Sequence, residues 1–407
     1  MKNIIILGGL KVKKNIKNLF FLTIILCLLA GIIKHPEMSI KSAMEGLSSW
    51  INIVFPSLFP FFVISEILIE IGFVNILGNS LQLIMKPLFN VSGEGAFPFV
   101  MSIMSGYPMG AKISSSLREK KIITKTEAER IICFSSTSGP LFMLGAVSVG
   151  MLKAPSLAPL ILYPHYLGAI TIGLLLRFYK KNQTPKDNKY KSPLKNSFRY
   201  IIDKDYHIGM ILGNCVKNSL ETIFTVGGFI VFYSVLTELL FASQAFNKLL
   251  CIIDYIFPLR INTDLFQGIV AGLLEITTGC NKIASLNIDF IYKVLIINFL
   301  IGWSGFSIHS QALSFISKTD IDAKIYIFSK FLHGIFSSSY TWIIYNLKYK
   351  NSAEISLIPD SQTFNYLFSS NLVEILIRST KLSFYIILYM FICSLILMII
   401  GKILSKN

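Results

Sequence analysis

Charged side chains are scarce in this chain. Asp, Glu, Lys and Arg make up 15% of its 407 residues, whereas an average soluble domain contains about 25%. Hydrophobic residues make up 53% of the chain, and its mean hydropathy is +0.63. A soluble domain needs a largely polar surface, which this composition cannot supply. The scarcity of charge therefore excludes an ordinary soluble protein and indicates that lipid surrounds most of the chain.

Motifs for metals, cofactors and catalysis are also missing. The six cysteines and five histidines are dispersed, without a C-x-x-C pair or a Cys/His spacing that suits zinc or haem. The stretch SGYPMGAK, residues 105–112, lacks the G-x-x-x-x-G-K-[ST] spacing of a phosphate-binding loop. No nucleophile–base pair rises above chance. We therefore expect neither an enzyme nor a bound metal or cofactor.

Acidic residues are too few to balance the basic ones, and the net charge is +16. Such an excess could indicate a nucleic-acid partner. Lysine and arginine gather, however, in two segments, Lys112 to Arg130 and Lys180 to Lys204, as is typical of cytoplasmic loops in membrane proteins. No aromatic platform or basic recognition helix accompanies them. We therefore expect no nucleic-acid partner.

Long apolar stretches, in contrast, recur along the chain. A bilayer core needs ~20 mostly apolar residues per spanning helix, and the pattern predicts an all-α polytopic integral membrane protein. The first stretch, 19–33, resembles a signal peptide, but no A-x-A-like site follows before Lys34, so we favour an uncleaved span with a cytoplasmic N-terminus. The expected divisions are 1–46 (N-terminal span and loop), 47–178 (first repeat), 179–210 (basic cytoplasmic linker), 211–347 (second repeat) and 348–407 (polar segment and C-terminal span).

The two halves of the chain resemble each other. Each contains a long span, a shorter segment, a half-length apolar piece, and a span interrupted by a Ser-Gly pair. Lys112-Ile113 recurs as Lys282-Ile283, and Ser138-Gly139 recurs as Ser304-Gly305. The loop after Lys112 is basic and suits the cytoplasm, whereas its counterpart after Lys282 suits the outside. We therefore predict inverted repeats with re-entrant or broken helices, related by an axis in the membrane plane.

The span at 47–72 gives a further sign of broken helices. It contains Pro56 and Pro60, and proline removes a backbone donor that neighbours must compensate in lipid. Glu66 and Glu70 lie near its end, where we expect a position at the membrane interface.

Interrupted helices also predict the binding site. In lipid, unwound backbone is tolerated only where it lines a cavity or is buried in protein, so matching interruptions in two halves indicate a ligand site. Freed helix ends offer N–H groups to anions or carbonyl groups to cations. The candidate positions are Ser105, Gly106, Pro108 and Gly110, with Gly279 as their counterpart, and Ser138 and Gly139, with Ser304 and Gly305 as theirs.

Charged side chains flank these interruptions. Lys112 and Lys282 would offer two cations to a small dianion; alternatively, Lys112 only begins the basic loop and Lys282 extends to the membrane surface. Glu275 lies in an apolar piece and is a candidate coupling-ion or proton site. Its alternatives are a salt bridge with Lys282 or a hydrogen bond to freed backbone. Further groups that could hydrogen-bond a polar ligand are Thr278, His309 and Gln311, although an intramembrane His also serves helix packing.

Five stretches resemble a known family. They are SGYPMGAK (105–112), FSSTSGPLFMLGAV (134–147), GGF (227–229), EITTGC (275–280) and GWSGFSIHSQ (302–311). At these motifs the chain resembles the YlbJ family of sporulation integral membrane proteins, also called stage V sporulation protein V, within the superfamily with nucleoside-transporter-like Gate domains. The resemblance covers nearly the whole chain and implies that both repeats are Gate-like.

The resemblance also implies a function. It places the protein in the outer forespore membrane, which derives from the mother cell, and implies movement of dipicolinic acid toward the developing spore. Dipicolinate is a small aromatic dianion, which agrees with glycine-rich helix ends and two lysines. We therefore expect a secondary transporter of such an anion in the lipid bilayer, without ATP hydrolysis. The alternatives are a nucleoside or ion permease and a non-transporting membrane scaffold for spore assembly.

Overall fold

The computed structural model describes residues 18–19, 22–180, 207–243 and 263–349, with the isolated residues 246, 248 and 252. Within these ranges the regular secondary structure is helical and includes no strand, which confirms the predicted all-α fold. The expected linker at 179–210 lies mostly outside the described residues. The expected C-terminal span from Leu382 to Ile400 lies wholly outside them.

A new helix begins at Pro36, directly after the helix Leu22–Lys34, and proline suits this position because its missing N–H would be unpaired there. From Pro36 on, the elements of the first half in chain order are α2 (Pro36–Ser49), the π-helical η1 (Trp50–Val54), α3 (Phe55–Glu70), α4 (Phe73–Phe89), the short η2 (Gly93–Gly95), α5 (Ala96–Ser105), α6 (Met109–Glu119), α7 (Lys125–Ser135), the π-helical η3 (Leu141–Met151), the short η4 (Pro155–Leu157) and α8 (Ala158–Leu176).

The described part of the second half begins with a helix of 35 residues, α10 (Ile208–Ala242). Its described elements are α10 (Ile208–Ala242), α12 (Thr263–Leu274), α13 (Ile276–Ser285), α14 (Phe290–Trp303), α15 (Gly305–Ile316), α16 (Ala323–Ile344) and the π-helical η6 (Tyr345–Tyr349).

Both halves contain half-length helices in the same order. In the first half, α5 and α6 have 10 and 11 residues, and α7 and η3 have 11 each. In the second, α12 and α13 have 12 and 10 residues, and α14 and α15 have 14 and 12. None reaches the ~20 residues that a span requires, and each half ends in one longer helix, α8 or α16. The broken helices are therefore present in both halves, while the inverted relation between the halves stays a prediction.

Within the described residues, three helical segments are long and apolar enough to cross a membrane: Pro155–Leu176, Ile208–Ala242 and Phe290–Ile316, the last of which consists of α14 and α15 joined at Ser304. A fourth candidate is the pair Leu22–Lys34 and Pro36–Asn52, which is bent by 104°. Only 28% of the apolar window of α10 is buried, against 56% and 61% for the windows around α8 and α14–α15. The exposed apolar residues of α10 therefore suit contact with lipid, and α8, α14 and α15 form the centre.

The prolines at 56 and 60 do not break their helix. The backbone stays helical from Pro36 to Glu70, with the π-helical segment η1 directly before Pro56. A π-bulge shifts the backbone hydrogen bonds by one residue, which accommodates a position where proline provides no donor. In place of the expected break, the helix widens locally into a π-helical segment. The expected division between residues 46 and 47 lies inside this continuous helix.

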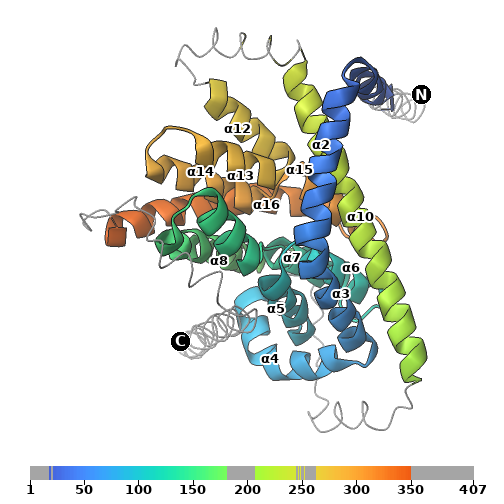
Figure 1. Cartoon of the computed structure of the whole chain (residues 1–407). Helices are drawn as coiled ribbons and strands as arrows, with labels where there is room; N and C mark the ends of the chain where they lie inside the picture. Colours follow the sequence, from blue (N-terminus) through green and yellow to red (C-terminus); the bar gives the residue numbers. More distant parts are fainter. Residues whose placement is uncertain are drawn as a thin grey trace, which may run out of the picture.

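The half-length helices are arranged around α16. Figure 1 shows α2 and α10 side by side along one edge of the molecule, where they pack against each other. Helix α16 packs against both α8 and α14. In this view α12 and α13 lie on one side of α16, and α5, α6 and α7 lie on the other. Residues of α16 can therefore contact groups from both halves.

Three loop regions meet at one end of the molecule. Arg118, at the end of α6, donates from Nε and from a terminal nitrogen to Asp320 in the α15–α16 loop, at 2.8 and 2.9 Å. This contact lowers the pKa of the Asp320 carboxyl below its ordinary value. Lys180, just after α8, pairs with Glu129 of α7 at 2.8 Å. The basic loop after Lys112 and the start of the linker, both expected in the cytoplasm, are thus joined by ion pairs to the α15–α16 loop and to α7.

Candidate functional site

The first candidate region is the crossing of two helix breaks in the first half. Gly106 ends α5 with φ of +89°, and a Cβ added to it would lie 2.6 Å from the backbone nitrogen of Gly139, in the break between α7 and η3. Ser102 supports this contact, because its hydroxyl accepts a hydrogen bond from the Thr137 N–H at 3.1 Å. The backbone of the two breaks thus meets directly.

The second half contains a matching crossing. Ser304 lies between α14 and α15 with φ of +74°, and Gly305 follows with φ of +75°. A Cβ on Gly305 would lie 3.2 Å from both Leu274 O and Ile276 N, which flank the break between α12 and α13. Each half therefore brings two helix breaks into backbone contact, and the predicted Ser-Gly pairs occupy these breaks.

The two remaining predicted glycines allow close packing. A Cβ on Gly110 would overlap the carbonyl of Ser135, and one on Gly279 would overlap the backbone of Gly272. Pro108, between Gly106 and Gly110 in the motif, follows a cis peptide bond. The glycines thus hold α6 against α7, and α13 against α12, so they position the crossings.

Glu275 caps a helix. Its carboxylate accepts hydrogen bonds from the N–H groups of Thr277 at 3.0 Å and Thr278 at 2.7 Å, and from the Thr278 hydroxyl at 2.9 Å. This is the alternative in which Glu275 bonds freed backbone, and the structure shows no pair with Lys282. The carboxylate also faces the positive end of the α13 dipole, which stabilises its charge.

We expect Glu275→Ala to lower the stability of the folded protein by about 0.5–2 kcal/mol, the usual cost of a lost helix cap. Glu275→Asp keeps an acceptor and should lose less. The midpoint of thermal unfolding in detergent measures both effects. Equal midpoints for the wild type and the alanine variant would contradict a capping role.

The two predicted lysines do not come together. Lys112, in the first turn of α6, forms an ion pair with Glu66 at 3.0 Å, and both side chains are largely buried. Lys282, in the last turn of α13, is more exposed and lies 3.9 Å from Glu238. Glu66 therefore lies in the interior as the partner of Lys112, in place of the interfacial position expected for it. A carboxylate already balances each of these lysines.

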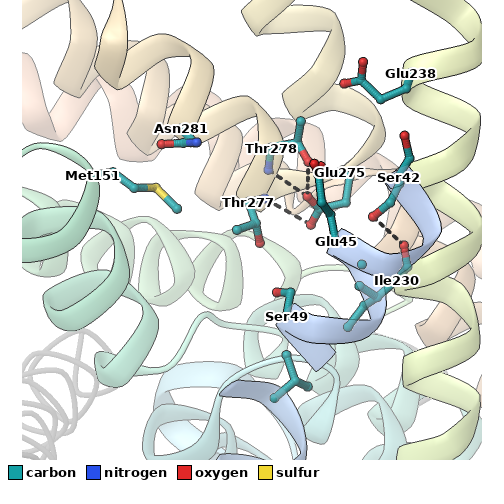
Figure 2. A pocket seen from close by; sticks show the side chains of 13 residues that line it. Ser42, Glu45, Ser49, Met151, Ile230, Glu238, Glu275, Thr277, Thr278 and Asn281 are labelled. Carbon is teal, nitrogen blue, oxygen red and sulfur yellow. Dashed lines mark hydrogen bonds between the residues drawn. The ribbon is translucent and has the colours of Figure 1, made fainter. Parts of the chain in front are cut away.

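A pocket of about 380 Å³ lies beside α13. Figure 2 shows Glu45 and Glu238 around it, together with Glu275 and its hydrogen-bonded threonines. Three carboxylates repel a dianion and suit a neutral or cationic ligand. The lining residues are Ser42, Glu45, Gly46, Ser49, Val54, Met151, Ile230, Ser234, Glu238, Glu275, Thr277, Thr278 and Asn281.

A second polar region, missed by the sequence analysis, is buried around Lys330 of α16. Its ammonium lies 2.8 Å from the Tyr107 hydroxyl, 2.8 Å from the Ser136 carbonyl and 3.1 Å from His333 Nδ1. Tyr107 in turn donates to the carbonyl of Ile301 at 3.0 Å. Because Tyr107 and Ser136 belong to the first half, this cluster joins the two halves next to the first crossing.

Two histidines extend this buried cluster. His165 of α8 and His333 of α16 lie with ring centroids 4.5 Å apart, and His333 Nε2 contacts the His165 carbonyl at 2.8 Å. His165 Nε2 accepts a hydrogen bond from the N–H of Ser138 at 2.9 Å. Ser138, a predicted site residue, is therefore connected through His165 to His333 and Lys330.

The other predicted polar residues lie apart from these bonds. Ser105 donates to the Met101 carbonyl of its own helix at 2.7 Å. His309 is buried with its ring 4.3 Å from that of Trp303, and neither ring nitrogen has a hydrogen-bond partner among the described residues. Gln311 is buried and makes one long contact, 3.5 Å, to Ser307. Whether these residues bind a ligand stays a prediction.

The sequence does contain a signal for the Lys330 cluster. An ionisable residue within an apolar span is costly and by default indicates function, and that rule selected Glu275. Lys330 and His333 lie in the apolar stretch from Tyr326 to Leu347, and His165 lies in the apolar stretch from 157 to 178. The same rule, applied to every span, would have selected all three. Across the described ranges, no group of three or more His, Cys, Asp or Glu side chains suits a metal ion.

Broken helices that cross within an apolar helical body, next to buried polar groups, define a transporter-like integral membrane protein. Residues 51–155 match the Gate family, described as nucleoside recognition; this range includes the first crossing. The chain is 34% identical to the sporulation integral membrane protein YlbJ of Bacillus subtilis over 343 residues, which cover 82% of this chain and 84% of the relative. It therefore belongs to the YlbJ family of sporulation integral membrane proteins.

A shorter similarity adds little. The chain is 29% identical over 114 residues to an uncharacterized protein of Alkalihalophilus pseudofirmus, covering 28% of this chain and 23% of that protein. No solved structure matches the chain.

Proposed function

We propose that this protein is a secondary transporter that moves a small organic anion, dipicolinate, across the outer forespore membrane during sporulation. The observation that supports transport is the pair of crossings, in which Gly106 meets Gly139 and Gly305 meets the break before α13. Unwound backbone at membrane depth is tolerated only inside protein or along a pathway. Two such crossings, one in each half, suit a site reached alternately from the two sides.

The anionic nature of the substrate is supported by charge at the first crossing. The buried ammonium of Lys330 lies next to this crossing and has no carboxylate ion-pair partner in the described part of the chain. Membership of a sporulation membrane protein family supports a substrate that sporulating cells move between compartments. Dipicolinate, a small dianion, fits both considerations.

A nucleoside is the second candidate substrate. The match to the Gate family, described as nucleoside recognition, favours it. So does the pocket lined by Glu45, Glu238 and Glu275, because carboxylates accept hydrogen bonds from sugar hydroxyls and repel a dianion. The two candidates therefore place the ligand in different regions of the protein.

Uptake by reconstituted protein separates the candidates. We would measure entry of radiolabelled dipicolinate and of uridine into vesicles that contain the purified protein, with empty vesicles as the control. Dipicolinate uptake that unlabelled uridine does not inhibit supports the proposal. Uridine uptake without dipicolinate uptake would replace it with the nucleoside permease.

A measurement in spores tests the biological role. A strain lacking this protein should accumulate dipicolinate in the mother cell and contain little of it in the spore, and the wild-type gene should restore the spore content. Normal spore dipicolinate, together with vesicles inactive toward both compounds, would favour a scaffold for spore assembly.

A further inference from the structure

Lys330 has the hydrogen-bond partners of a charged ammonium. A protonated lysine has three N–H donors and no acceptor, whereas a neutral amine has only two donors. Its contacts are three acceptors: the Ser136 carbonyl, the Tyr107 oxygen and His333 Nδ1. The Tyr107 hydroxyl uses its proton on Ile301 O, and the proton of His333 lies on Nε2, which faces a carbonyl. All three partners therefore accept from Lys330.

This charge is buried without a negative side chain beside it. Lys330 is 0% exposed, and no carboxylate of the described residues forms an ion pair with it, in contrast to the buried Lys112, which lies 3.0 Å from Glu66. Ser136 caps the C-terminus of α7, so the negative end of that helix dipole offsets part of the charge. The remaining positive charge favours an anion at this position.

Some buried donors without partners among the described residues belong to residues on or next to the elements that contact Lys330. Tyr326 lies one helical turn before Lys330, and its buried hydroxyl and the Oγ of Ser136 make no hydrogen bond of standard geometry to any described residue. His165 Nε2 accepts from Ser138, so its proton lies on Nδ1, which also has no partner among the described residues. A buried donor left unpaired costs about 1–3 kcal/mol, and a carboxylate would satisfy several of these donors at once.

We propose that Lys330 binds a carboxylate of the transported anion, which rests on the function proposed above and identifies the group that recognises the substrate's charge. A carboxylate offers about four acceptor sites. It would replace the Ser136 carbonyl at the ammonium and accept hydrogen bonds from the buried hydroxyls of Tyr326 and Ser136. Since Lys330 is fully buried, the described conformation is closed around this site, and the neighbouring crossing of Gly106 and Gly139 must open for the anion to enter.

Equilibrium dialysis of the purified full-length protein tests this proposal. We would measure binding of radiolabelled pyridine-2,6-dicarboxylate near neutral pH to the wild type and to Lys330→Gln, Lys330→Met and Lys120→Gln. Glutamine keeps a hydrogen-bond donor, and methionine keeps apolar volume, which often leaves the stability of a buried charge site unchanged or higher. We expect both Lys330 variants to weaken binding by roughly 30-fold or more. Lys120→Gln, which removes a partly exposed charge paired with Glu70, should change it less than about fivefold.

Competition by the neutral pyridine-2,6-dicarboxamide separates recognition from a structural role. If Lys330 recognises charge, its replacement should weaken binding of the dianion and leave the weak competition by the diamide unchanged. If Lys330 has a purely structural role, its replacement should weaken the binding of both compounds, which would overturn the proposal. Unchanged dianion binding by a folded Lys330 variant would also overturn it, with the proposed function intact. If the wild type itself does not bind the dianion, the proposed substrate is wrong and this proposal is wrong with it.

Discussion

Replacing Lys112 by methionine is expected to destabilise the folded protein by about 3–5 kcal/mol. The side chains of Lys112 and Glu66 are 8% and 13% exposed and lie 3.0 Å apart, so the substitution leaves a largely buried carboxylate without its counter-ion. The combined variant Lys112→Met/Glu66→Leu removes both charges and should recover most of the loss. The midpoint of thermal unfolding in detergent measures these differences. It is monitored as the loss of monodisperse protein after heating.

The neighbouring pair of Lys120 and Glu70 provides a matched control. It joins the same two helices at nearly the same distance, 2.9 Å, but its side chains are 40% and 48% exposed. Exposed pairs contribute at most about 1 kcal/mol, so Lys120→Met should have little effect. If Lys112→Met and Lys120→Met were equally mild, burial would not decide the strength of the first pair. If the combined variant were as unstable as Lys112→Met, the loss would come from packing.

The sequence allowed the membrane location and the helix breaks to be predicted, because both follow from local composition. Apolar stretches identify surroundings of lipid, and a Ser-Gly pair within such a stretch marks a place where helix is interrupted. Ser304 and Gly305 have positive φ values, as such a place requires. The same reasoning was wrong at Pro56, because the π-helical widening of η1 depends on backbone hydrogen bonds that composition does not specify.

The ion-pair and hydrogen-bond partners of the candidate residues could not be predicted, because they are distant in the chain. Lys112 was expected to offer its charge to a ligand, but Glu66 lies beside it. Lys330 shows the reverse: its importance comes from having acceptors without a carboxylate, which only the packing of α7, α8 and α16 determines. Glu275 was recognised as unusual, but its role depends on the N–H groups that the break exposes.

Replacing Gly106 by alanine is expected to have the other large effect, on both stability and transport. Its φ of +89° and ψ of −164° fall in a region that is essentially restricted to glycine, at a cost of about 1–3 kcal/mol for other residues. The added Cβ would also lie 2.6 Å from the backbone nitrogen of Gly139. Because backbone cannot move aside as a flexible side chain can, the two breaks must separate.

Gly305→Ala and Gly145→Ala complete this experiment. Gly305 has a φ of +75°, but its Cβ would meet its neighbours at 3.2 Å, so we expect strain with a weaker clash and a smaller loss than for Gly106. Gly145 lies in η3, and an added Cβ would meet nothing within 4 Å, so its alanine variant should unfold and transport like the wild type. The midpoint of thermal unfolding and the uptake rate into vesicles should therefore fall in the order Gly145, Gly305, Gly106.

If Gly106→Ala matched Gly145→Ala in both measurements, close backbone contact between the breaks would not be needed for transport. If uptake fell in both crossing variants beyond what the lost stability explains, the two crossings would act together in the transport cycle, as the predicted inverted repeats require.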